Sequence, residues 1–108
     1  MSDLASRQCV PCRGGVPPME KQEIARLVAE LLGWEVVDQH HLKKSYKFAN
    51  FREAQDFVVT VGNLSEEQGH HPDISYGWGK AEILIWTHKI DGLTESDFIL
   101  AAKIDKLL

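Results

Sequence analysis

The sequence predicts a small α+β domain in which a four-stranded antiparallel sheet carries three helices packed on one face. Three segments have the apolar spacing of helices, and four shorter segments have strand character and form two hairpins. Their order along the chain is α-β-β-α-β-β-α. Two hairpins and three helices of this size pack most simply as one antiparallel sheet with helices on one side. The 108 residues suffice for one core and are too few for two.

Composition and charge narrow the function classes. The chain is 44% hydrophobic and 26% charged, as folded globular proteins are. Its net charge of −4 does not favour binding to nucleic acid or to anionic lipid. No apolar run approaches the ~20 residues that span a bilayer, and no apolar region after Met1 resembles a secretory signal. We therefore expect a soluble, cytoplasmic protein with neither a nucleic-acid nor a membrane partner.

The first 18 residues are rich in proline and glycine and have no apolar period, which predicts a flexible N-terminal arm before a domain at 19–108. Cys9 and Cys12 form a single CxxC on this arm. A zinc ribbon would need a second pair, and a thioredoxin-type motif would open a helix after a strand. Two thiols on an arm is the simpler interpretation, and a metal or redox role stays open.

A first helix is predicted over 19–32, with Gly33 as its stop. Its apolar residues recur at helical spacing: Ile24, Leu27, Val28 and Leu31. Two strands are predicted next, over 34–38 and 42–48, around a short polar turn. Lys44 falls on the apolar face of the second strand, so we expect that end of the face to reach solvent.

A second helix is predicted from Asn50 to near Gly69, because Asn50 and Glu53 form a variant of the capping box. Its expected buried stripe is Phe51, Ala54, Phe57, Val58, Val61 and Leu64. Two strands follow at 73–77 and 80–87. The second has apolar residues on both faces, which indicates either a central strand or a face covered by a partner subunit.

The last helix is predicted over 95–107, capped by Thr94 with Asp97 at its third position. Asp97 is foremost a helix-start residue, but a carboxylate at a helix N-terminus can also serve a pocket. Glu66 and Glu67 fall in the last turn of the second helix, where acids oppose the helix dipole, which hints at another use.

Four of the five histidines form the pairs His40-His41 and His70-His71, and the fifth is His88. The first pair lies in a predicted hairpin turn and is expected to be solvated. The other three lie where elements end. Pro72 favours an extended conformation at His71, so both rings of the second pair reach one pocket only if the chain bends there.

Imidazole has a pKa near 6.5, so a histidine cluster both accepts and donates protons near neutrality. Such a cluster suits a dehydration or a tautomerisation, in which only protons move. From the residues alone, three hypotheses stay open for these histidines: acid–base catalysis, a zinc site, and surface or structural positions.

Several segments together resemble the pterin-4a-carbinolamine dehydratases, and the likeness covers roughly residues 20–106. They are Gly33-Trp34, Tyr46 to Phe51, Glu66 to Asp73 (EEQGHHPD), Trp78-Gly-Lys80, Trp86-Thr-His88, Gly92 to Phe98, and Ala101 to Asp105. The resemblance implies the same α-β-β-α-β-β-α fold. It also implies removal of water from 4a-hydroxytetrahydropterin to give quinonoid dihydropterin, which regenerates the cofactor of aromatic amino-acid hydroxylases.

The resemblance further implies a homodimer or homotetramer that needs no metal or organic cofactor. Some animal members also serve as the dimerisation cofactor of a homeodomain transcription factor. A non-catalytic protein-binding role on the same fold is therefore an alternative. A metalloprotein that uses Cys9, Cys12 and the histidines is another.

The family's site residues carry over to positions of this chain. The catalytic set is His70, His71, His88 and Asp97; the substrate-binding set is Trp34, Glu66, Pro72, Thr87, His88, Lys89 and Ile90. His71 is expected to be the acid, because Pro72 constrains it, while His70 and His88 bind substrate and complete the proton transfer. Asp97 would orient a histidine. Ile74 stands where animal members have an aromatic residue, so stacking there is not expected.

Overall fold

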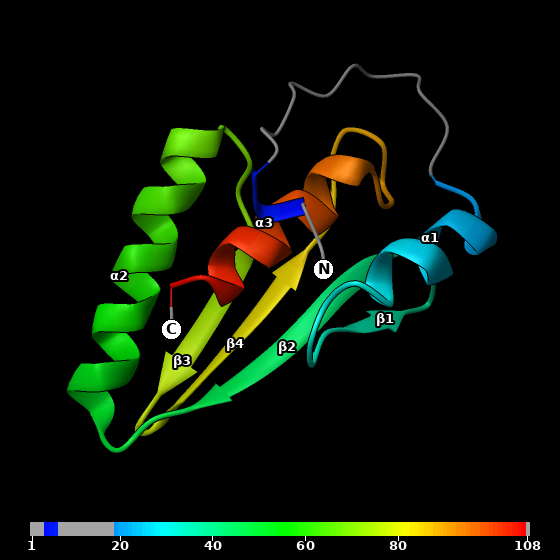
Figure 1. Ribbon diagram of the computed structural model, residues 1–108. Coiled ribbons are helices and arrows are strands. Elements are labelled where there is room, and N and C mark those ends of the chain that lie inside the picture. The colour runs from blue at the N-terminus through cyan, green and yellow to red at the C-terminus, as the bar shows by residue number, and fades with distance from the viewer. Residues whose placement is uncertain (1–3, 7–18, 108) are drawn as a thin grey trace.

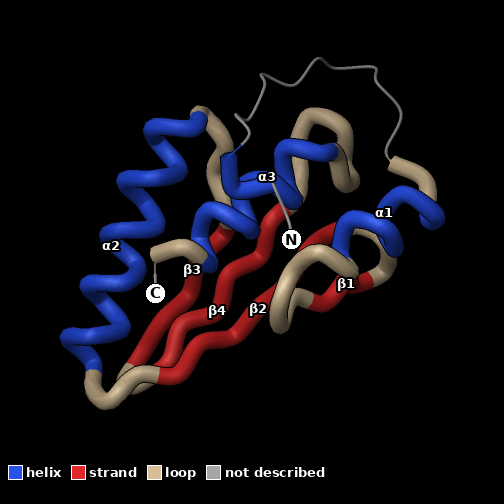
Figure 2. The backbone as a smooth tube through the Cα atoms, in the orientation of Figure 1, coloured by secondary structure: helices blue, strands red, loops and turns tan. Residues whose placement is uncertain are grey.

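The computed structural model describes residues 4–6 and 19–107. In this part of the chain, four antiparallel strands form one sheet in the order β1-β2-β4-β3, and helices cover one of its faces (Figures 1 and 2). The elements are η1 (Leu4–Ser6), α1 (Lys21–Val28), β1 (Glu35–Val37), β2 (His41–Lys47), α2 (Phe51–Gln68), β3 (Asp73–Gly77), β4 (Lys80–Ile85) and α3 (Glu95–Asp105). The predicted fold class is confirmed.

Strand β4 is central, as one of the two interpretations of its sequence required. It pairs with β2 through Leu42 opposite Ile85, and with β3 through Ile74 opposite Ile83. The helix-covered face buries Leu42, Tyr46, Ala81, Ile83 and Ile85. The opposite face carries polar side chains such as Lys43, Ser45 and Glu82. The alternation of period two therefore specifies which face meets the helices.

Three elements end two or more residues earlier than predicted, each because the backbone changes its hydrogen-bonding partner. After α1, the amides of Glu30 and Leu31 bond to the carbonyls three residues back, which tightens the chain before Gly33 (φ 81°). Strand β4 ends at Ile85, since the Thr87 amide bonds to the Gly92 carbonyl at 2.9 Å. Helix α3 ends at Asp105 with a similar tightening.

Helix α2 begins and ends as predicted. The Asn50 side chain accepts the Glu53 amide at 2.9 Å, and Gly69 ends the helix in the left-handed conformation at φ 66°. The buried stripe was wrong at Phe51, which is 42% exposed in the first turn and packs its ring against Tyr76. Ser65 joins the buried face instead, and its hydroxyl donates to the Val61 carbonyl at 2.8 Å.

Three residues of the expected arm depart from that expectation. Leu4–Ser6 form a 3₁₀ turn against α3, Leu4 is fully buried, and Lys103 donates to the Ala5 carbonyl at 2.8 Å. Cys9, Cys12 and the rest of the arm lie outside the described residues. Of the helices that the structure describes, none is both long and apolar enough to cross a bilayer.

Candidate functional site

The end of α2 turns His70 toward the interior. Gly69 reverses the chain, and the His70 amide bonds to the Ser65 carbonyl at 3.1 Å. The side chain of His70 is 9% exposed, whereas that of His71 is 58% exposed. The two neighbouring rings therefore lie in different environments, one inside the fold and one at its surface.

The Asp97 carboxylate is the partner of His70. Asp97 is fully buried, and its Oδ1 lies 2.5 Å from His70 Nε2. Its Oδ2 accepts the Thr87 hydroxyl at 2.9 Å and the Thr94 amide at 2.8 Å. The last contact belongs to the predicted capping box of α3. Three donors and the positive end of the helix dipole thus stabilise a carboxylate removed from water.

This arrangement fixes the protonation pattern of the His70 ring. A carboxylate only accepts hydrogen bonds, so Nε2 of His70 carries the proton that faces Asp97. In the described part of the chain, no buried side-chain nitrogen or oxygen lacks a hydrogen-bond partner. Nδ1 of His70 has no partner there, so it must reach the surface. In a neutral His70, Nδ1 is therefore a hydrogen-bond acceptor at the surface, while Nε2–H donates to Asp97.

Glu66 lies beside His71. Its Oε1 is 3.2 Å from His71 Nε2, and both side chains are largely exposed. Glu66 occupies the last turn of α2, where its charge opposes the helix dipole, and the contact with His71 gives the acid a local partner. Pro72 follows at once and leads into β3.

The loop after β4 carries the remaining predicted contacts. The Thr87 carbonyl accepts the amides of Ile90 and Asp91 at 3.1 and 2.9 Å, so the backbone polar groups of Thr87 are used within the loop. His88 is exposed, and its ring packs edge-on against Trp86 with centroids 4.3 Å apart. Among the described residues, no hydrogen bond, ion pair or ring contact joins His88 to His70 or His71.

A metal cluster is not formed by the described side chains. No group of three or more histidines, cysteines, aspartates or glutamates among residues 4–6 and 19–107 could hold an ion. Cys9 and Cys12, which the metalloprotein hypothesis also used, lie outside these ranges.

Comparison with known proteins assigns the family. The family model described as pterin 4 alpha carbinolamine dehydratase matches residues 17–107. The chain belongs to this family. A Rubrobacter xylanophilus protein named "Putative pterin-4-alpha-carbinolamine dehydratase" is 65% identical over 99% of this chain and 100% of its own length. A protein of the same name from Alkaliphilus metalliredigens is 49% identical over 98% and 96%. The resemblance predicted from the sequence is confirmed.

Two solved structures extend the comparison. A transcriptional coactivator/pterin dehydratase from Brucella melitensis matches with a TM-score of 0.78 and 26% identity, over 83% of this chain and 97% of that one. A pterin dehydratase-like protein described as a RuBisCO assembly factor in the alpha-carboxysome matches with a TM-score of 0.60 and 26% identity, over 69% and 88%. Proteins described by enzymatic and by assembly roles therefore share this pterin dehydratase fold.

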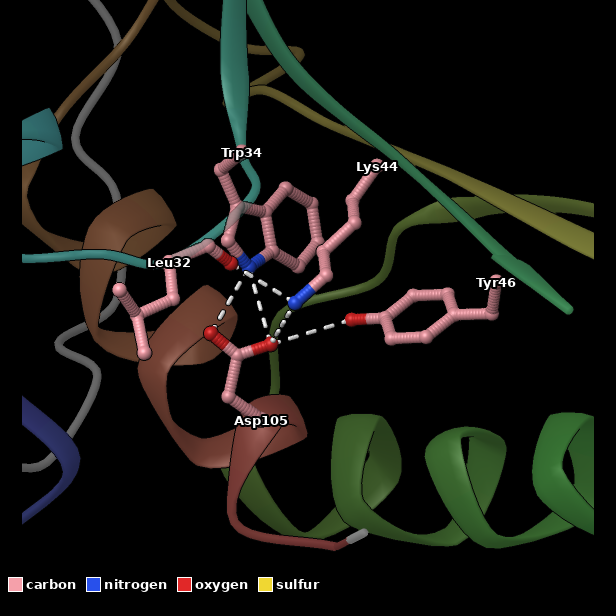
Figure 3. Close-up of polar contacts among 5 residues, drawn as sticks. All are labelled: Leu32, Trp34, Lys44, Tyr46 and Asp105. Atoms are coloured by element: carbon pink, nitrogen blue, oxygen red, sulfur yellow. Dashed lines mark hydrogen bonds and ion pairs between the residues drawn. The ribbon is translucent and has the colours of Figure 1, made fainter.

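Trp34 lies apart from the His70–Asp97 pair in this member of the family. Its indole Nε1 donates to both oxygens of Asp105 at 3.1 Å (Figure 3). Asp97 and Asp105 stand at opposite ends of α3, eight residues and about 12 Å apart along the helix. The structure brings His70 together with Asp97, and His71 with Glu66, but it does not bring Trp34 to either pair.

Asp105 organises a polar cluster that the sequence analysis missed. Besides Trp34, its Oδ1 accepts Lys44 Nζ at 2.9 Å and the Tyr46 hydroxyl at 3.2 Å, and Lys44 also donates to the Leu32 carbonyl at 2.8 Å (Figure 3). The side chains of Lys44 and Asp105 are 19% and 24% exposed, so this end of the strand face reaches solvent only in part. The sequence did contain one signal for this cluster, a lysine on an apolar strand face, because a charged group that is removed from water needs a partner of opposite charge.

The cluster makes the fold sensitive to alkali through Tyr46. Burial raises the pKa of the Tyr46 hydroxyl, and the charge of Asp105 and its hydrogen bond raise this pKa further. A raised folded-state pKa contributes stability that is complete below the unfolded pKa of about 10 and is lost as pH rises above it. We expect Tyr46→Phe to be less stable at neutral pH and to lose less stability than the wild type above pH ~10.

Urea unfolding at a series of pH values measures this difference. Tyr76→Phe is the matched control, because Tyr76 is 41% exposed and packs on Phe51 rather than on Asp105. Equal alkaline losses in the wild type and in Tyr46→Phe would contradict the prediction.

Proposed function

We propose that this chain removes water from a 4a-hydroxytetrahydropterin and releases a quinonoid dihydropterin. The buried His70–Asp97 pair, with the second ring nitrogen of His70 at the surface, is the observation that carries the proposal. Family membership and the names of relatives 65% and 49% identical supply the substrate class. These names describe the relatives, and we assign the same activity to this chain because of the geometry of its site.

The reaction consists of two proton movements. The bond from C4a to oxygen breaks, and the hydroxyl leaves as water once it has received a proton. The N5–H gives up its proton as the double bond from C4a to N5 forms. An acid and a base are both required, and each contributes on the order of 10²–10⁴-fold. Only protons and water move, so the proposal requires no metal or organic cofactor.

The geometry suggests a division of these roles. His70 suits the base, since its Nδ1 can accept the N5 proton while Nε2–H stays on Asp97. His71 suits the acid at the hydroxyl, because Pro72 restricts its backbone and Glu66 orients its ring. The exposure of His71 lets it regain a proton from water after each turnover. His88 would orient the substrate from the loop after β4.

The same loop offers groups for the amide-like edge of the pterin. Within 87–90, the N–H and the C=O of Lys89 form no backbone hydrogen bond with any residue that the structure describes. A donor and an acceptor on one residue match the alternating donor and acceptor of that edge. We therefore assign the backbone contact to Lys89 rather than to Thr87, whose amide and carbonyl are already used.

The proposed product returns to the pterin cofactor cycle that aromatic amino-acid hydroxylases use, so a hydroxylase is the expected source of the substrate. A homodimer or homotetramer remains the expected assembly. Both statements extend the family resemblance to this chain, and size-exclusion chromatography with light scattering tests the second.

The decisive test is the dehydration rate of His71→Ala, followed by stopped-flow or in a coupled hydroxylase assay. We expect the rate to fall by about 10²-fold, since the acid at the leaving hydroxyl is lost. Glu67→Ala is the matched control, because Glu67 is an exposed acid in the same turn of α2. A wild-type rate in His71→Ala would reject the assignment.

A non-catalytic assembly role is the second candidate, favoured by the likeness to the RuBisCO assembly factor. Pterin binding separates the two candidates, with the fluorescence of the three tryptophans as the signal. A wild-type protein that neither binds nor dehydrates the pterin would favour the assembly role.

A further inference from the structure

The turn between β1 and β2 lies against the loop that follows β4. Leu42 at the start of β2 is paired with Ile85 at the end of β4, so this turn and this loop meet at one end of the sheet (Figure 1). We call residues 38–40 the hairpin turn and residues 87–92 the substrate loop. The substrate loop carries His88 and Lys89, to which the proposed function assigns pterin contacts.

A hydrogen bond joins the turn to the loop. His40 Nε2 lies 2.7 Å from Asp91 Oδ1. The His40 side chain is 32% exposed, so the turn that was expected to be solvated is only partly so. Asp91 is 87% exposed, so the hydrogen bond lies at the surface.

Aromatic contacts join the same two segments. The rings of His40 and His41 lie 5.4 and 5.8 Å from the Trp86 ring, and His88 packs on Trp86 as well. Nδ1 of His40 is 3.1 Å from Nδ1 of His41. When the proton on Nε2 of a neutral His40 is donated to Asp91, its Nδ1 accepts from His41. The contact with Asp91 therefore orients both rings of the pair against Trp86.

Both segments contain left-handed backbone at non-glycine residues. Asp91 has a φ of 56°, a conformation that such a residue keeps only where the surrounding structure holds it. Asp38 and Gln39 have φ values of 53° and 54°, the pattern of a type I′ turn, whose twist matches that of its two strands. The hydrogen bond from His40 therefore reaches the loop at a residue whose conformation needs support.

We infer that His40 is a positioning residue for the pterin site, acting through Asp91 and Trp86 on the backbone of Lys89 and on the ring of His88. This inference rests on the proposed function. His40 does not touch the reacting atoms; it limits the conformations of the segment that does. Loss of the contact should weaken substrate binding more than it slows the proton transfers at His70 and His71.

The test compares KM and kcat for the pterin in His40→Ala, His40→Gln and the wild type. A lost contact of such an exposed pair corresponds to roughly a twofold to fivefold rise in KM, and we expect a smaller change in kcat. His40→Gln keeps an N–H donor near the position of Nε2 and should restore much of the wild-type KM. A purely structural role would lower the melting temperature and leave the KM of the folded enzyme unchanged.

Asp91→Gly tests the contact from the other side, because glycine adopts the left-handed conformation without strain and offers no carboxylate. Its KM should rise as in His40→Ala, and the double variant should be no worse than either single one. Glu35→Ala is the control, since Glu35 is exposed on the same hairpin without a described side-chain contact. Hydrogen exchange of the amides at 88–92 should be faster in His40→Ala than in this control.

Three outcomes would overturn the inference. An unchanged KM in His40→Ala, with or without faster exchange, removes the positioning role while the proposed function stands. Independent rather than coupled effects in the double variant remove the pathway through Asp91. A wild-type protein without dehydratase activity overturns the proposed function and this inference together.

Discussion

Asp97→Asn is expected to lower the dehydration rate by about 10³-fold while the protein stays folded. The amide of asparagine has one accepting oxygen, and the Thr87 hydroxyl and Thr94 amide already occupy the Oδ2 side. The amide NH₂ would then face His70 Nε2 and turn it into an acceptor. The His70 proton would move to Nδ1, so the outward nitrogen could no longer take a proton from the substrate.

The measurement pairs the single-turnover rate with thermal unfolding. Asp97→Asn keeps the oxygen that caps α3, so its melting temperature should stay above the assay temperature. Asp97→Ala loses this oxygen and is expected to be less stable. Asp56→Asn is the matched control, since it removes one charge from an exposed aspartate on α2. A rate within tenfold of the wild type in Asp97→Asn would show that His70 does not depend on the tautomer that Asp97 imposes.

The role of Asp97 illustrates why local patterns predicted much of the fold and part of the site. Thr94 and Asp97 form a capping box, which is a local motif, and the same carboxylate that caps the helix accepts from His70. Gly69 likewise both ends α2 and turns His70 inward. Where one residue serves both the backbone and a polar contact, sequence spacing locates the residue, whereas the expectation that Asp97 orients a histidine came from the family resemblance.

Contacts between distant segments were beyond such patterns. Lys44 and Asp105 are 61 residues apart, and Trp34 and Asp105 are 71 apart. Periodicity placed Lys44 on the apolar face, but it could not choose its partner among 16 acidic residues. The contact of His40 was missed for the same reason, because only the strand register brings its turn to Asp91. Such contacts depend on the strand register and on how the helices pack on the sheet, which local sequence patterns do not specify.

The Asp105 cluster leads to the largest expected change in stability. Asp105 lies in the last turn of α3, where a negative charge opposes the helix dipole, so its three donors must outweigh this cost. Without the Asp105 carboxylate, Lys44 Nζ would keep the Leu32 carbonyl as its one acceptor. The Tyr46 hydroxyl and the Trp34 indole N–H would have no acceptor, although these residues are only 6% and 7% exposed. The ion pair is partly buried, with Lys44 19% and Asp105 24% exposed, so the loss combines a broken pair with two buried donors left without an acceptor, which is strongly destabilising.

We therefore expect Asp105→Ala to lose about 3–5 kcal/mol of unfolding free energy, which lowers the melting temperature by roughly 12–25 °C. Lys106→Ala is the matched control: Lys106 is exposed beside Asp105 and should stay within about 0.5 kcal/mol of the wild type. Urea unfolding at pH 7 measures both. A loss below about 1 kcal/mol in Asp105→Ala would mean that water replaces the carboxylate at its donors.

The double replacement Asp105→Leu with Lys44→Leu separates the charge pair from the packing around it. If the destabilisation comes from the unpaired ammonium, an apolar pair of similar volume should recover a large part of the loss. The recovery should stay incomplete, since the Trp34 indole N–H and the Tyr46 hydroxyl would still lack an acceptor. Because Asp105 stands at the far end of α3 from Asp97, the pterin KM of the folded fraction should match the wild type in every variant of this cluster. A changed KM would instead mean that the loss of the cluster shifts α3 and, with it, Asp97 at the other end of the helix.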